Sequence, residues 1–515
     1  MLLDIRPDHL RMVLDILQKH VPQYEVWAFG SRAKWTAKDY SDLDLCVVSD
    51  KPLSFSLLGA LAEDFSESDL PWKVDVVDWA TVSESFRKII KRDKVVVQKG
   101  AGMSEWRTYP LAELTINHDG KRKPVKESER RVGPYPYYGA SGIVDYVDDY
   151  LIDGDYLLIA EDGENLRTRQ TPIAFMARGK SWVNNHAHIV TGNNKADTRF
   201  LMYALQSADV SAYLTGAVMP KLTQGNLNRI PISCPPLDEQ RAIAHILGTL
   251  DDKIELNRRM NETLEAIARA MFKSWFVDFD PVRAKMSGEP PESICQRLGL
   301  TPDLLALFPD RLVDSELGEI PEGWRVGTIG DHCYLNAESW SAKTIPDVVH
   351  YVDLANVKSG IISEVQILPS ASAPSRARRI LRADDTIIGT VRPGNRSFTL
   401  IGEDEPQLTG STGFAVLSPK RKASREMVFF LATSDENIGR LSRLADGAAY
   451  PAVRSEVVTA GACIVPDPSV IDEFHAATAS MIDYQIANRI SNDTLGAARD
   501  TLLPKLLSGE LRLIS

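Results

Sequence analysis

The chain has 515 residues, too many for one hydrophobic core, and a typical size of roughly 100–200 residues per domain favours several domains. Its 44% hydrophobic and 25% charged residues are ordinary for a folded protein, which excludes wholesale disorder, collagen and small disulfide scaffolds. The net charge of −11 disfavours a protein whose whole surface binds nucleic acid, but it permits local basic patches. No apolar stretch approaches the ~20 residues of a membrane span.

The N-terminal hundred residues predict a small α/β domain. Residues 9–21 have the periodicity of an amphipathic helix. Residues 24–48 indicate a strand, a Gly-Ser turn, a polar segment and a second strand, and residues 73–79 indicate a third strand.

Three acidic residues on these strands indicate a metal-dependent site. Alternation along a strand puts Asp42 and Asp44 on one face, and such a pair can hold Mg²⁺ together with triphosphate oxygens. Asp75 on the later strand is a candidate second metal ligand or activator of an attacking hydroxyl. The turn of Gly30 and Ser31 would offer backbone N–H groups to phosphates if it opens a helix. The alternative is a surface strand that carries two acids.

The Gly-Ser…Asp-x-Asp pattern within residues 1–100 resembles the minimal nucleotidyltransferases of the DNA polymerase β-like superfamily, whose small bacterial members often act as antitoxins. The resemblance implies nucleotidyl transfer at the three acids, nucleotide binding by the Gly-Ser turn, and Mg²⁺ and a nucleoside triphosphate as cofactors. It does not identify the acceptor.

Beyond this domain the chain repeats itself. NRRMNET at 257–263 reappears as NRISNDT at 488–494, 231 positions later. Further pairs keep the same order, namely 216–222 (GAVMPKL) with 447–453 (GAAYPAV) and 154–163 with 384–394. This period is far too long for a solenoid repeat, so one domain-plus-helix unit is used twice.

Each unit predicts a β-rich part followed by a long helix. YLLIA at 156–160 and TIIGTV at 386–391 are short apolar runs bounded by Asp and Gly, which is typical of buried strands. From Asp238 to about Phe276 there is no Pro and only one Gly, which predicts a helix about 57 Å long. Two such helices would hold two domains at a fixed distance, a geometry that suits reading two patches on one DNA duplex.

Both long helices carry a heptad stripe with a polar centre. The first stripe runs through Ile243, Leu247, Leu250, Ile254, Asn257, Asn261, Leu264, Ala268, Met271 and Trp275. The second runs through Phe474, Thr478, Met481, Gln485, Asn488, Asn492, Leu495, Arg499, Leu502 and Leu506. A polar residue in such a stripe costs stability but fixes register, so we expect the helices to pack on each other. The alternative is that each helix packs only on its own β-rich part.

Residues 101–515 closely resemble the specificity subunit of type I restriction–modification systems, a phage-defence machinery. Three segments carry the resemblance: 235–282, 288–324 and 501–513 (TLLPKLLSGELRL). It implies two target recognition domains that each read half of a split double-stranded DNA site. It also implies a spacer of two long helices that docks methyltransferase subunits, expected to number two, after which restriction/translocase subunits join. The complex would be cytoplasmic.

The sequence therefore predicts an α+β multidomain protein, with an α/β nucleotidyltransferase domain followed by two β-rich recognition domains separated by two long antiparallel coiled-coil helices. The expected boundaries are 1–100 for the nucleotidyltransferase-like domain, 101–235 for the first recognition domain, 236–285 for the first helix, 286–320 for a linker, 321–466 for the second recognition domain and 467–515 for the second helix.

Basic clusters in the two recognition domains are the candidate DNA contacts, because Arg reads guanine, Asn reads adenine, and Lys and the remaining Arg hold phosphates. The candidates are Lys121, Arg122, Lys123, Arg167, Arg169 and Lys221 in the first domain, and Arg376, Arg378, Arg379, Arg392, Asn395 and Arg396 in the second. The RPGNR and ENLRTR segments occupy matching places after a strand. The alternative is a solvated charged face.

Residues 101–515 offer no convincing catalytic motif and predict no cofactor of their own. No amino-methyltransferase motif is present, and His186 and His188 lack the further Cys, His or Asp partners that a metal site would need. A specificity subunit would borrow its chemistry from its partners. Two other functions remain open: a nucleotidyltransferase that a DNA-binding body targets to its acceptor, and a stand-alone transcriptional regulator.

Overall fold

The computed structural model of the chain describes residues 3–38, 40–49, 51–100, 106–216, 218–445 and 451–513. It divides into two compact units, Met1–Leu250 with Ala498–Ser515, and Asp251–Ala497. Both units mix helices and sheets, in agreement with the predicted α+β class. Within the described ranges no helix is long and apolar enough to cross a membrane.

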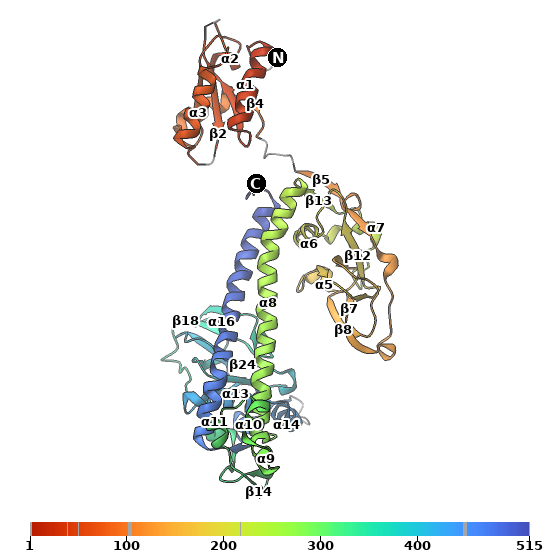
Figure 1. Cartoon of the computed structure of the whole chain (residues 1–515), viewed down its shortest axis with the longest axis vertical. Helices are drawn as coiled ribbons and strands as arrows, with labels where there is room; N and C mark the ends of the chain where they lie inside the picture. The colour runs from red at the N-terminus through yellow and green to blue at the C-terminus, as the bar shows by residue number, and fades with distance from the viewer. Residues whose placement is uncertain are drawn as a thin grey trace. The chain divides into compact units, whose positions relative to one another are not determined.

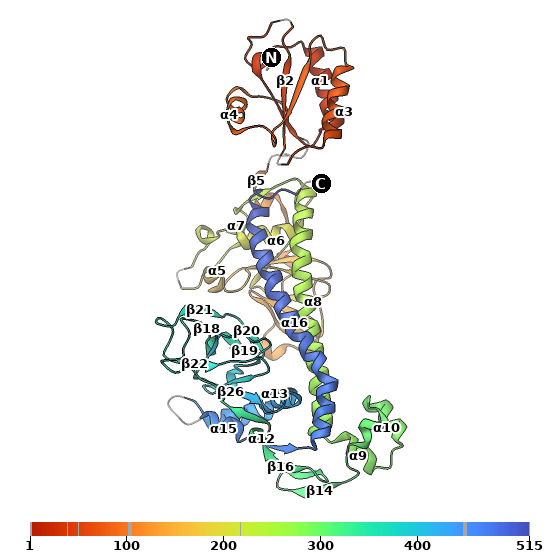
Figure 2. The same cartoon turned by 90° about the vertical axis from the view of Figure 1, so that its left-hand side faces the viewer.

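The N-terminal domain is a four-stranded sheet in the order β3-β2-β1-β4, with α1 and α3 on one side and α4 on the other (Figure 2). Its elements are α1 (Pro7–His20), β1 (Glu25–Phe29), α2 (Gly30–Ala33), β2 (Leu43–Val48), α3 (Phe55–Ser66), β3 (Val74–Asp78), α4 (Glu84–Asp93) and β4 (Val95–Gln98). The apolar strands bury Val13 and Leu17 of α1 on one face and Ile90 of α4 on the other. Ser54 and Ser83 start α3 and α4 because their hydroxyls accept the first free amides.

The first β-rich body, residues 106–234, contains the sheets β10-β9-β12-β6, β11-β7-β8 and β13-β5. Its strands are β5 (Arg107–Pro110), β6 (Thr115–Asn117), β7 (Val132–Gly139), β8 (Gly142–Val147), β9 (Tyr156–Ala160), β10 (Ala174–Ala177), β11 (Trp182–Val183), β12 (Ala187–Gly192) and β13 (Pro231–Cys234). Its helices are α5 (Asn165–Thr168), α6 (Thr198–Ser207) and α7 (Gln224–Leu227), with 3-10 turns η1 (Leu111–Glu113), η2 (Asp119–Lys121), η3 (Glu127–Glu129) and η4 (Ser211–Tyr213).

The second β-rich body, residues 324–465, repeats this plan, because its sheet β24-β23-β26-β17 has the strand order of β10-β9-β12-β6 and its pair β16-β27 matches β5-β13. Its strands are β16 (Arg325–Thr328), β17 (Cys333–Leu335), β18 (Val348–Val352), β19 (Val357–Lys358), β20 (Ile361–Ile362), β21 (Gln366–Pro369), β22 (Ala377–Ile380), β23 (Thr386–Gly389), β24 (Phe398–Leu400), β25 (Leu408–Ser411), β26 (Phe414–Pro419) and β27 (Ala462–Val465). Its helices are α12 (Ile329–His332), α13 (Arg425–Thr433), α14 (Asp435–Ala445) and α15 (Ser455–Thr459), with 3-10 turns η5 (Leu354–Asn356), η6 (Pro393–Asn395) and η7 (Lys422–Ser424).

The two long helices are α8 (Leu237–Phe276) and α16 (Pro468–Leu507), which run side by side in Figures 1 and 2. Each has 40 residues, or about 60 Å at 1.5 Å per residue. In the second unit the pairing is antiparallel, because Phe272 near the end of α8 packs on Phe474 near the start of α16. None of the residues in the two predicted heptad stripes is exposed, which is what a shared interface requires.

The asparagines at the centres of the two stripes bond to each other across the helix interface. Asn257 Nδ2 donates to Asn492 Oδ1 at 2.9 Å, and Asn488 Nδ2 donates to Asn261 Oδ1 at 2.8 Å. The sequence repeat relates Asn257 to Asn488 and Asn261 to Asn492, so each bond is the twofold copy of the other.

Two further bonds follow the same symmetry. Asn261 Nδ2 donates to the carbonyl oxygen of Gln485 at 3.1 Å, and Asn492 Nδ2 donates to that of Ile254 at 3.5 Å. Ile254 and Gln485 are again 231 positions apart. We call Asn257, Asn261, Asn488 and Asn492 the asparagine node; within it, the Oδ1 atom of Asn257 is buried without a partner.

An arginine fixes each β-rich body to its own long helix. Arg199 of α6 donates to the carbonyl of Gly248 in α8 at 2.9 Å, and Arg425 of α13 donates to the carbonyl of Ala479 in α16 at 3.4 Å. Gly248 and Ala479 are repeat-equivalent positions. A Cβ on Gly248 would lie 2.4 Å from Cζ of Arg199, so glycine is what lets this arginine pass close to the helix.

The segment between the first long helix and the second body, predicted as a linker over 286–320, is folded. The linker range contains α10 (Pro291–Leu298), α11 (Pro302–Ala306) and the hairpin β14 (Leu312–Ser315) with β15 (Gly318–Pro321). It is preceded by α9 (Asp280–Met286), which lies at the end of the range predicted for the first long helix, since α8 ends at Phe276. Ile294, Leu305 and Phe308 are buried in the same core as Trp275 of α8, which explains why this stretch is ordered.

Candidate functional site

The sheet register of the N-terminal domain brings its predicted acidic residues to one end of the sheet. Phe29 pairs with Asp44 across β1 and β2, and Asp44 pairs with Asp75 across β2 and β3. Gly30 follows Phe29 directly and opens α2, so the Gly-Ser turn lies beside the carboxylates.

The backbone at Gly30 approaches Asp44 very closely. Gly30 has φ +78°, and a Cβ there would lie 2.1 Å from Oδ2 of Asp44, so only glycine fits. Burial, together with the charges of Asp75 and Asp42, raises the pKa of Asp44 above its usual value. A cation would relieve this repulsion, and an all-oxygen donor set is the one Mg²⁺ prefers. These residues therefore fit a divalent metal.

The third acid is engaged differently. Lys73 Nζ lies 2.5 Å from Oδ1 of Asp75; the lysine side chain is largely exposed and that of Asp75 is half-buried. Across the described ranges, no three His, Cys, Asp or Glu side chains are grouped closely enough to hold a metal. A metal at Asp42 and Asp44 would need further oxygens from a bound ligand, which is how Mg²⁺ is often completed by phosphates.

The loop that leads to Asp42 is held by an arginine that the sequence did not single out. Arg32 of α2 is buried, stacks 4.5 Å from the Trp72 ring, and donates from Nε to the carbonyl of Ser41 at 2.8 Å. It thus ties the helix that starts at Gly30 to the residue before Asp42.

In the first β-rich body, the loop after β9 is bonded to the loop that precedes α7. The amide of Leu222 donates to the carbonyl of Glu161 at 2.7 Å, and the amide of Gly163 donates to the carbonyl of Pro220 at 3.1 Å. The second loop carries the predicted Lys221 and ends the GAVMPKL segment.

The second body repeats both bonds. The amide of Val453 donates to the carbonyl of Thr390 at 2.9 Å, and the amide of Arg392 donates to that of Pro451 at 2.9 Å. We call these two structures the paired loops: residues 161–163 with 215–222 in the first body, and 390–392 with 451–453 in the second. Residue 217 and residues 447–450, which belong to the repeated GAVMPKL and GAAYPAV segments, lie outside the described residues.

One helical turn follows each paired loop and ends at an arginine in the left-handed conformation. Arg169 follows α5 with φ +52°, and Arg396 follows η6 with φ +58°. Arg169 donates to the carbonyl of Ala208 at 2.7 Å, and Arg396 pairs with Asp435 at 2.6 Å. Non-glycine residues in this conformation are strained and cluster at functional sites.

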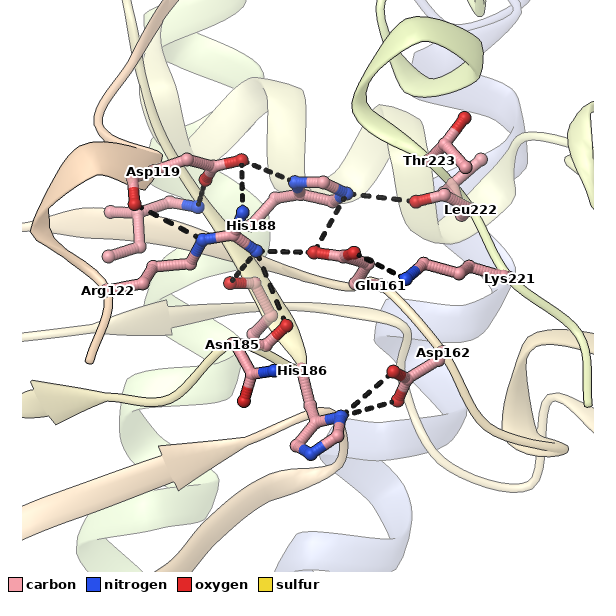
Figure 3. A network of polar contacts seen from close by, with 12 residues as sticks. Asp119, Arg122, Glu161, Asp162, Asn185, His186, His188, Lys221, Leu222 and Thr223 are labelled. Atoms are coloured by element: carbon pink, nitrogen blue, oxygen red, sulfur yellow. Dashed lines mark hydrogen bonds and ion pairs between the residues drawn. The ribbon is translucent and has the colours of Figure 1, made fainter. Parts of the chain in front are cut away.

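A polar network lies behind the first paired loop (Figure 3). His188 is buried, with Nδ1 2.6 Å from Oδ2 of Asp119 and Nε2 2.9 Å from the carbonyl oxygen of Leu222. Both ring nitrogens therefore lie within hydrogen-bond distance of an oxygen atom. Asp119 also accepts the amide of Ile189 at 2.7 Å. The histidine therefore joins the η2 turn to the paired loop.

Glu161 is the second centre of this network. Arg122 Nη1 donates to Glu161 Oε2, and Lys221 Nζ lies 3.1 Å from Glu161 Oε1 (Figure 3). His186 instead lies at the surface, 2.9 Å from Asp162. His186 and His188 thus have different surroundings, although they are only two residues apart.

Ion pairing outweighs burial at both acids of the network. Burial alone would raise the pKa of Asp119, but hydrogen bonds from His188 and the Ile189 amide, with the charge of Arg122, hold it below its usual value. Burial likewise opposes ionisation of Glu161, and Arg122 and Lys221 lower its pKa. Both carboxylates are therefore charged at neutral pH.

The structure separates the predicted DNA-contact residues into two groups. Those with exposed side chains are Lys121, Lys123, Arg167, Lys221, Arg376, Arg392 and Asn395. Those that are partly buried are Arg122, Arg169, Arg378, Arg379 and Arg396. Burial lowers the pKa of Arg169 and of Arg379.

Among the exposed group, several side chains are already held in position. Arg376 lies 2.5 Å from Asp353 and donates to the Tyr351 hydroxyl at 3.0 Å. Lys121 donates to the hydroxyl of Tyr156 at 3.2 Å. Arg167 donates to the carbonyl of Gly216 in the paired loop at 3.1 Å. Such contacts fix the direction of a long side chain before any ligand arrives.

Comparison with known families agrees with this geometry. Residues 103–266 match the family "Type I restriction modification DNA specificity domain", and residues 10–99 match the family "Nucleotidyltransferase domain". The type I restriction enzyme MjaIX specificity subunit of Methanocaldococcus jannaschii is 22% identical over 79% of this chain and 94% of its own length. The crystal structure of a type I restriction-modification S subunit from M. genitalium shares the fold, with a TM-score of 0.50, 13% identity, and coverage of 79% of this chain and 97% of that one.

The chain is a type I specificity subunit with an N-terminal nucleotidyltransferase domain. The N-terminal domain is 58% identical to MntA of Haemophilus influenzae, described as a probable protein adenylyltransferase, over 19% of this chain and 85% of that protein. In this specificity subunit the two β-rich bodies correspond to the predicted recognition domains.

Sequence reasoning missed several residues that shape the specificity subunit's sites. Asp119, Glu161 and Arg199 were not singled out, because an acid beside a basic cluster, or one arginine in a helix, has no distinctive spacing. Arg199 and Arg425 lie at the starts of the equivalent helices α6 and α13, but the repeat offset of 231 positions does not align them, so only the structure relates them.

Proposed function

We propose that the specificity subunit reads a bipartite double-stranded DNA site, with one half-site contacted by the paired loops of each β-rich body. The observation that carries this proposal is the repetition of the paired loops. Their backbone hydrogen bonds are the same in both bodies, whereas their side chains differ, as two readers of different half-sites require. Loops on a rigid scaffold are where binding specificity commonly lies.

The exposed polar side chains of the two bodies are assigned to different contacts. Arg392 and Asn395 follow β23 and have the chemistry to read guanine and adenine in the major groove. Lys121 and Lys123 are suited to phosphates. Arg122, Arg169 and Arg379 are partly buried, and we assign them to holding the loops rather than to DNA.

The proposed partners follow from the family. Type I specificity subunits assemble with methyltransferase and restriction subunits, and we propose that two methyltransferase subunits dock along α8 and α16. The polar outer faces of these helices carry charged pairs such as Arg259 with Glu255 at 2.8 Å, which leaves them solvated and open to a partner. No cofactor is proposed for residues 101–515.

Methylome sequencing of a host with and without the gene tests the main proposal. We expect methylation at one bipartite motif to disappear with the gene. Exchanging residues 101–235 for the recognition domain of another specificity subunit should then change only one half of that motif. Unchanged methylation at every motif, in a host whose partner genes are intact, would refute DNA reading by this subunit.

We further propose that the N-terminal domain transfers a nucleotidyl group from a nucleoside triphosphate to an acceptor hydroxyl, with release of pyrophosphate. A bound Mg²⁺ would neutralise charge on the phosphates. Asp42 and Asp44 would hold it, Gly30 and Ser31 would place backbone amides near the phosphates, and Asp75 would take the acceptor's proton. The support is the close fit of Gly30 against Asp44 and the repulsion among the carboxylates.

The double variant Asp42→Asn with Asp44→Asn tests this second function. Label transfer from radiolabelled triphosphates should fall by orders of magnitude, because two charges facing the metal are lost. Methylation of the host motif should persist. Asp15→Asn, at an exposed acid of the same domain, is the matched control.

The same experiment separates the alternative, a nucleotidyltransferase that the DNA-binding body targets to its acceptor. Modification of an acceptor that is lost in the double variant, in a host that lacks methyltransferase and translocase genes beside this one and in which no motif methylation depends on the chain, favours that alternative. Absence of transfer by the wild-type chain to any component of a host lysate refutes nucleotidyl transfer.

A further inference from the structure

The first paired loop ends in two exposed apolar side chains. Val218 is 95% exposed and Met219 is 62% exposed. Two adjacent exposed apolar side chains on one loop are available for contact with a partner. They follow Gly216 and precede Pro220 in the repeated GAVMPKL segment.

The loop that carries them is closed and braced. Thr215 and Lys221 exchange two backbone hydrogen bonds of 2.9 and 2.8 Å at its base. Gly216 has φ +87°, and a Cβ there would lie 2.2 Å from the carbonyl oxygen of Met219, so the turn is too tight for any other residue. The loop therefore presents Val218 and Met219 from a fixed base.

Cationic side chains lie at the base of the loop that carries these two residues. Lys221 and Arg167 are exposed, and Arg167 donates to the carbonyl of Gly216 at 3.1 Å. His186, half exposed, is held by Asp162, which forms a β-bridge with Lys221. An apolar tip with cations at its base matches proteins that insert a wedge between base pairs while cations hold the flanking phosphates.

The second repeat has a corresponding sequence, of which residues 447–450 lie outside the described residues. GAAYPAV aligns with GAVMPKL, so Tyr450 stands in the sequence where Met219 stands, and both precede the proline of the paired loop. The side chains differ, but each has a large flat or flexible apolar group that can lie against a base. The backbone bonds that hold the described ends of both loops are the same.

We propose that Val218 and Met219 form an apolar wedge that enters the DNA base stack at the half-site read by the first β-rich body. This inference rests on the proposed DNA-reading function and specifies one of its contacts. The wedge contributes affinity through contact with bases, and it opens one base step for the neighbouring side chains.

The test uses the complete complex with its methyltransferase subunits and duplexes that carry the motif found by methylome sequencing. 2-Aminopurine is placed at successive positions of the half-site, excluding the methylated adenine. Binding of the wild-type complex should raise the fluorescence of 2-aminopurine at one base step of the half-site. The variant Val218→Ser with Met219→Ser should abolish that signal and weaken binding about tenfold, without changing the salt dependence, because no phosphate contact is lost.

Val132→Ser is the control, since Val132 is 92% exposed in the same body but lies on β7. Equal affinity and equal fluorescence for wild type and the double variant would overturn the wedge while leaving DNA reading intact. If the double variant no longer assembles with the methyltransferase subunits but contacts DNA as wild type does, the wedge proposal is wrong and Val218 and Met219 contact a protein instead. A wild-type complex that binds no bipartite motif would overturn both proposals.

Discussion

Alanine substitution within the asparagine node should produce an ordered set of costs that follows the internal repeat. We expect Asn492→Ala and Asn261→Ala to be the more damaging pair, and Asn257→Ala and Asn488→Ala to be the milder pair. The order follows from the bonds, because Asn261 and Asn492 each accept one side-chain bond and donate another to a backbone carbonyl.

The magnitudes follow from what each substitution leaves behind. Asn492→Ala leaves the side-chain amide of Asn257, a residue that is 1% exposed, without its acceptor, and it also removes the bond to the carbonyl of Ile254. We therefore expect the local opening free energy to fall by about 2–4 kcal/mol. Asn257→Ala removes a side chain whose own Oδ1 is already unpaired, and it leaves Asn492 bonded to Ile254, so about 1 kcal/mol or less is expected. Replacing both Asn257 and Asn492 by Leu should be neutral or stabilising, at the expense of register.

Hydrogen exchange measured by mass spectrometry on peptides from the centres of α8 and α16 is the suitable assay, because it reports local opening free energies in a multidomain chain. Equal costs at all four positions, or an order in which Asn257 exceeds Asn492, would refute the assigned network. A difference between the members of a repeat-related pair would refute its twofold symmetry.

Four further predictions concern the two sites and their supports. Asp44→Asn should raise the melting temperature in the absence of divalent metal, because the raised pKa of Asp44 means that its charge destabilises the fold at neutral pH. The difference in melting temperature between variant and wild type should vanish below about pH 4, where Asp44 is protonated in both the folded and the unfolded state. Mg²⁺ should raise the melting temperature of wild type only, and differential scanning fluorimetry measures both effects. Gly248→Ala should displace Arg199 and increase hydrogen exchange in α6, whereas Ala479→Gly at the equivalent position should leave α13 unaffected. DNA binding by the assembled complex should weaken with salt at a log–log slope of about −5 if about six phosphates are neutralised, and a flat titration would contradict the basic clusters. Asp119 and Glu161 have lowered pKa values, so the stabilisation that each contributes is present above about pH 4 and is lost as the pH falls through the folded-state values. Circular dichroism should show a smaller acid-induced loss of stability for Asp119→Asn than for wild type, because only the contribution of Glu161 remains.

The sequence by itself determined the architecture, because the signals that carry it are local or periodic. The heptad stripes predicted two long helices and their mutual packing, since a stripe of apolar residues must be buried and two central Asn residues need partners. The Gly-Ser…Asp-x-Asp pattern at Gly30, Asp42 and Asp44 resembles that of the minimal nucleotidyltransferases, and this resemblance predicted the N-terminal domain. The repeat predicted two bodies of one plan, which the matching strand orders of their central sheets now make explicit.

The tertiary structure alone decided which basic residues face solvent. Arg122 stands between two exposed lysines in the sequence, yet it turns inward because Glu161, far along the chain, lies beneath it. Likewise, nothing in the spacing of Asp119 and His188 shows that they share a bond, since their contact depends on the pairing of β12 with β6.

Composition and periodicity report how much charge or apolar surface a segment carries, and this is sufficient to predict elements and their buried faces. Ion pairs between distant residues depend on sheet register and loop geometry, where a shift of one position reverses the side chain's direction. For this reason the candidate DNA-binding segments could be located from the sequence, whereas the choice between a contact residue and a supporting residue required the fold.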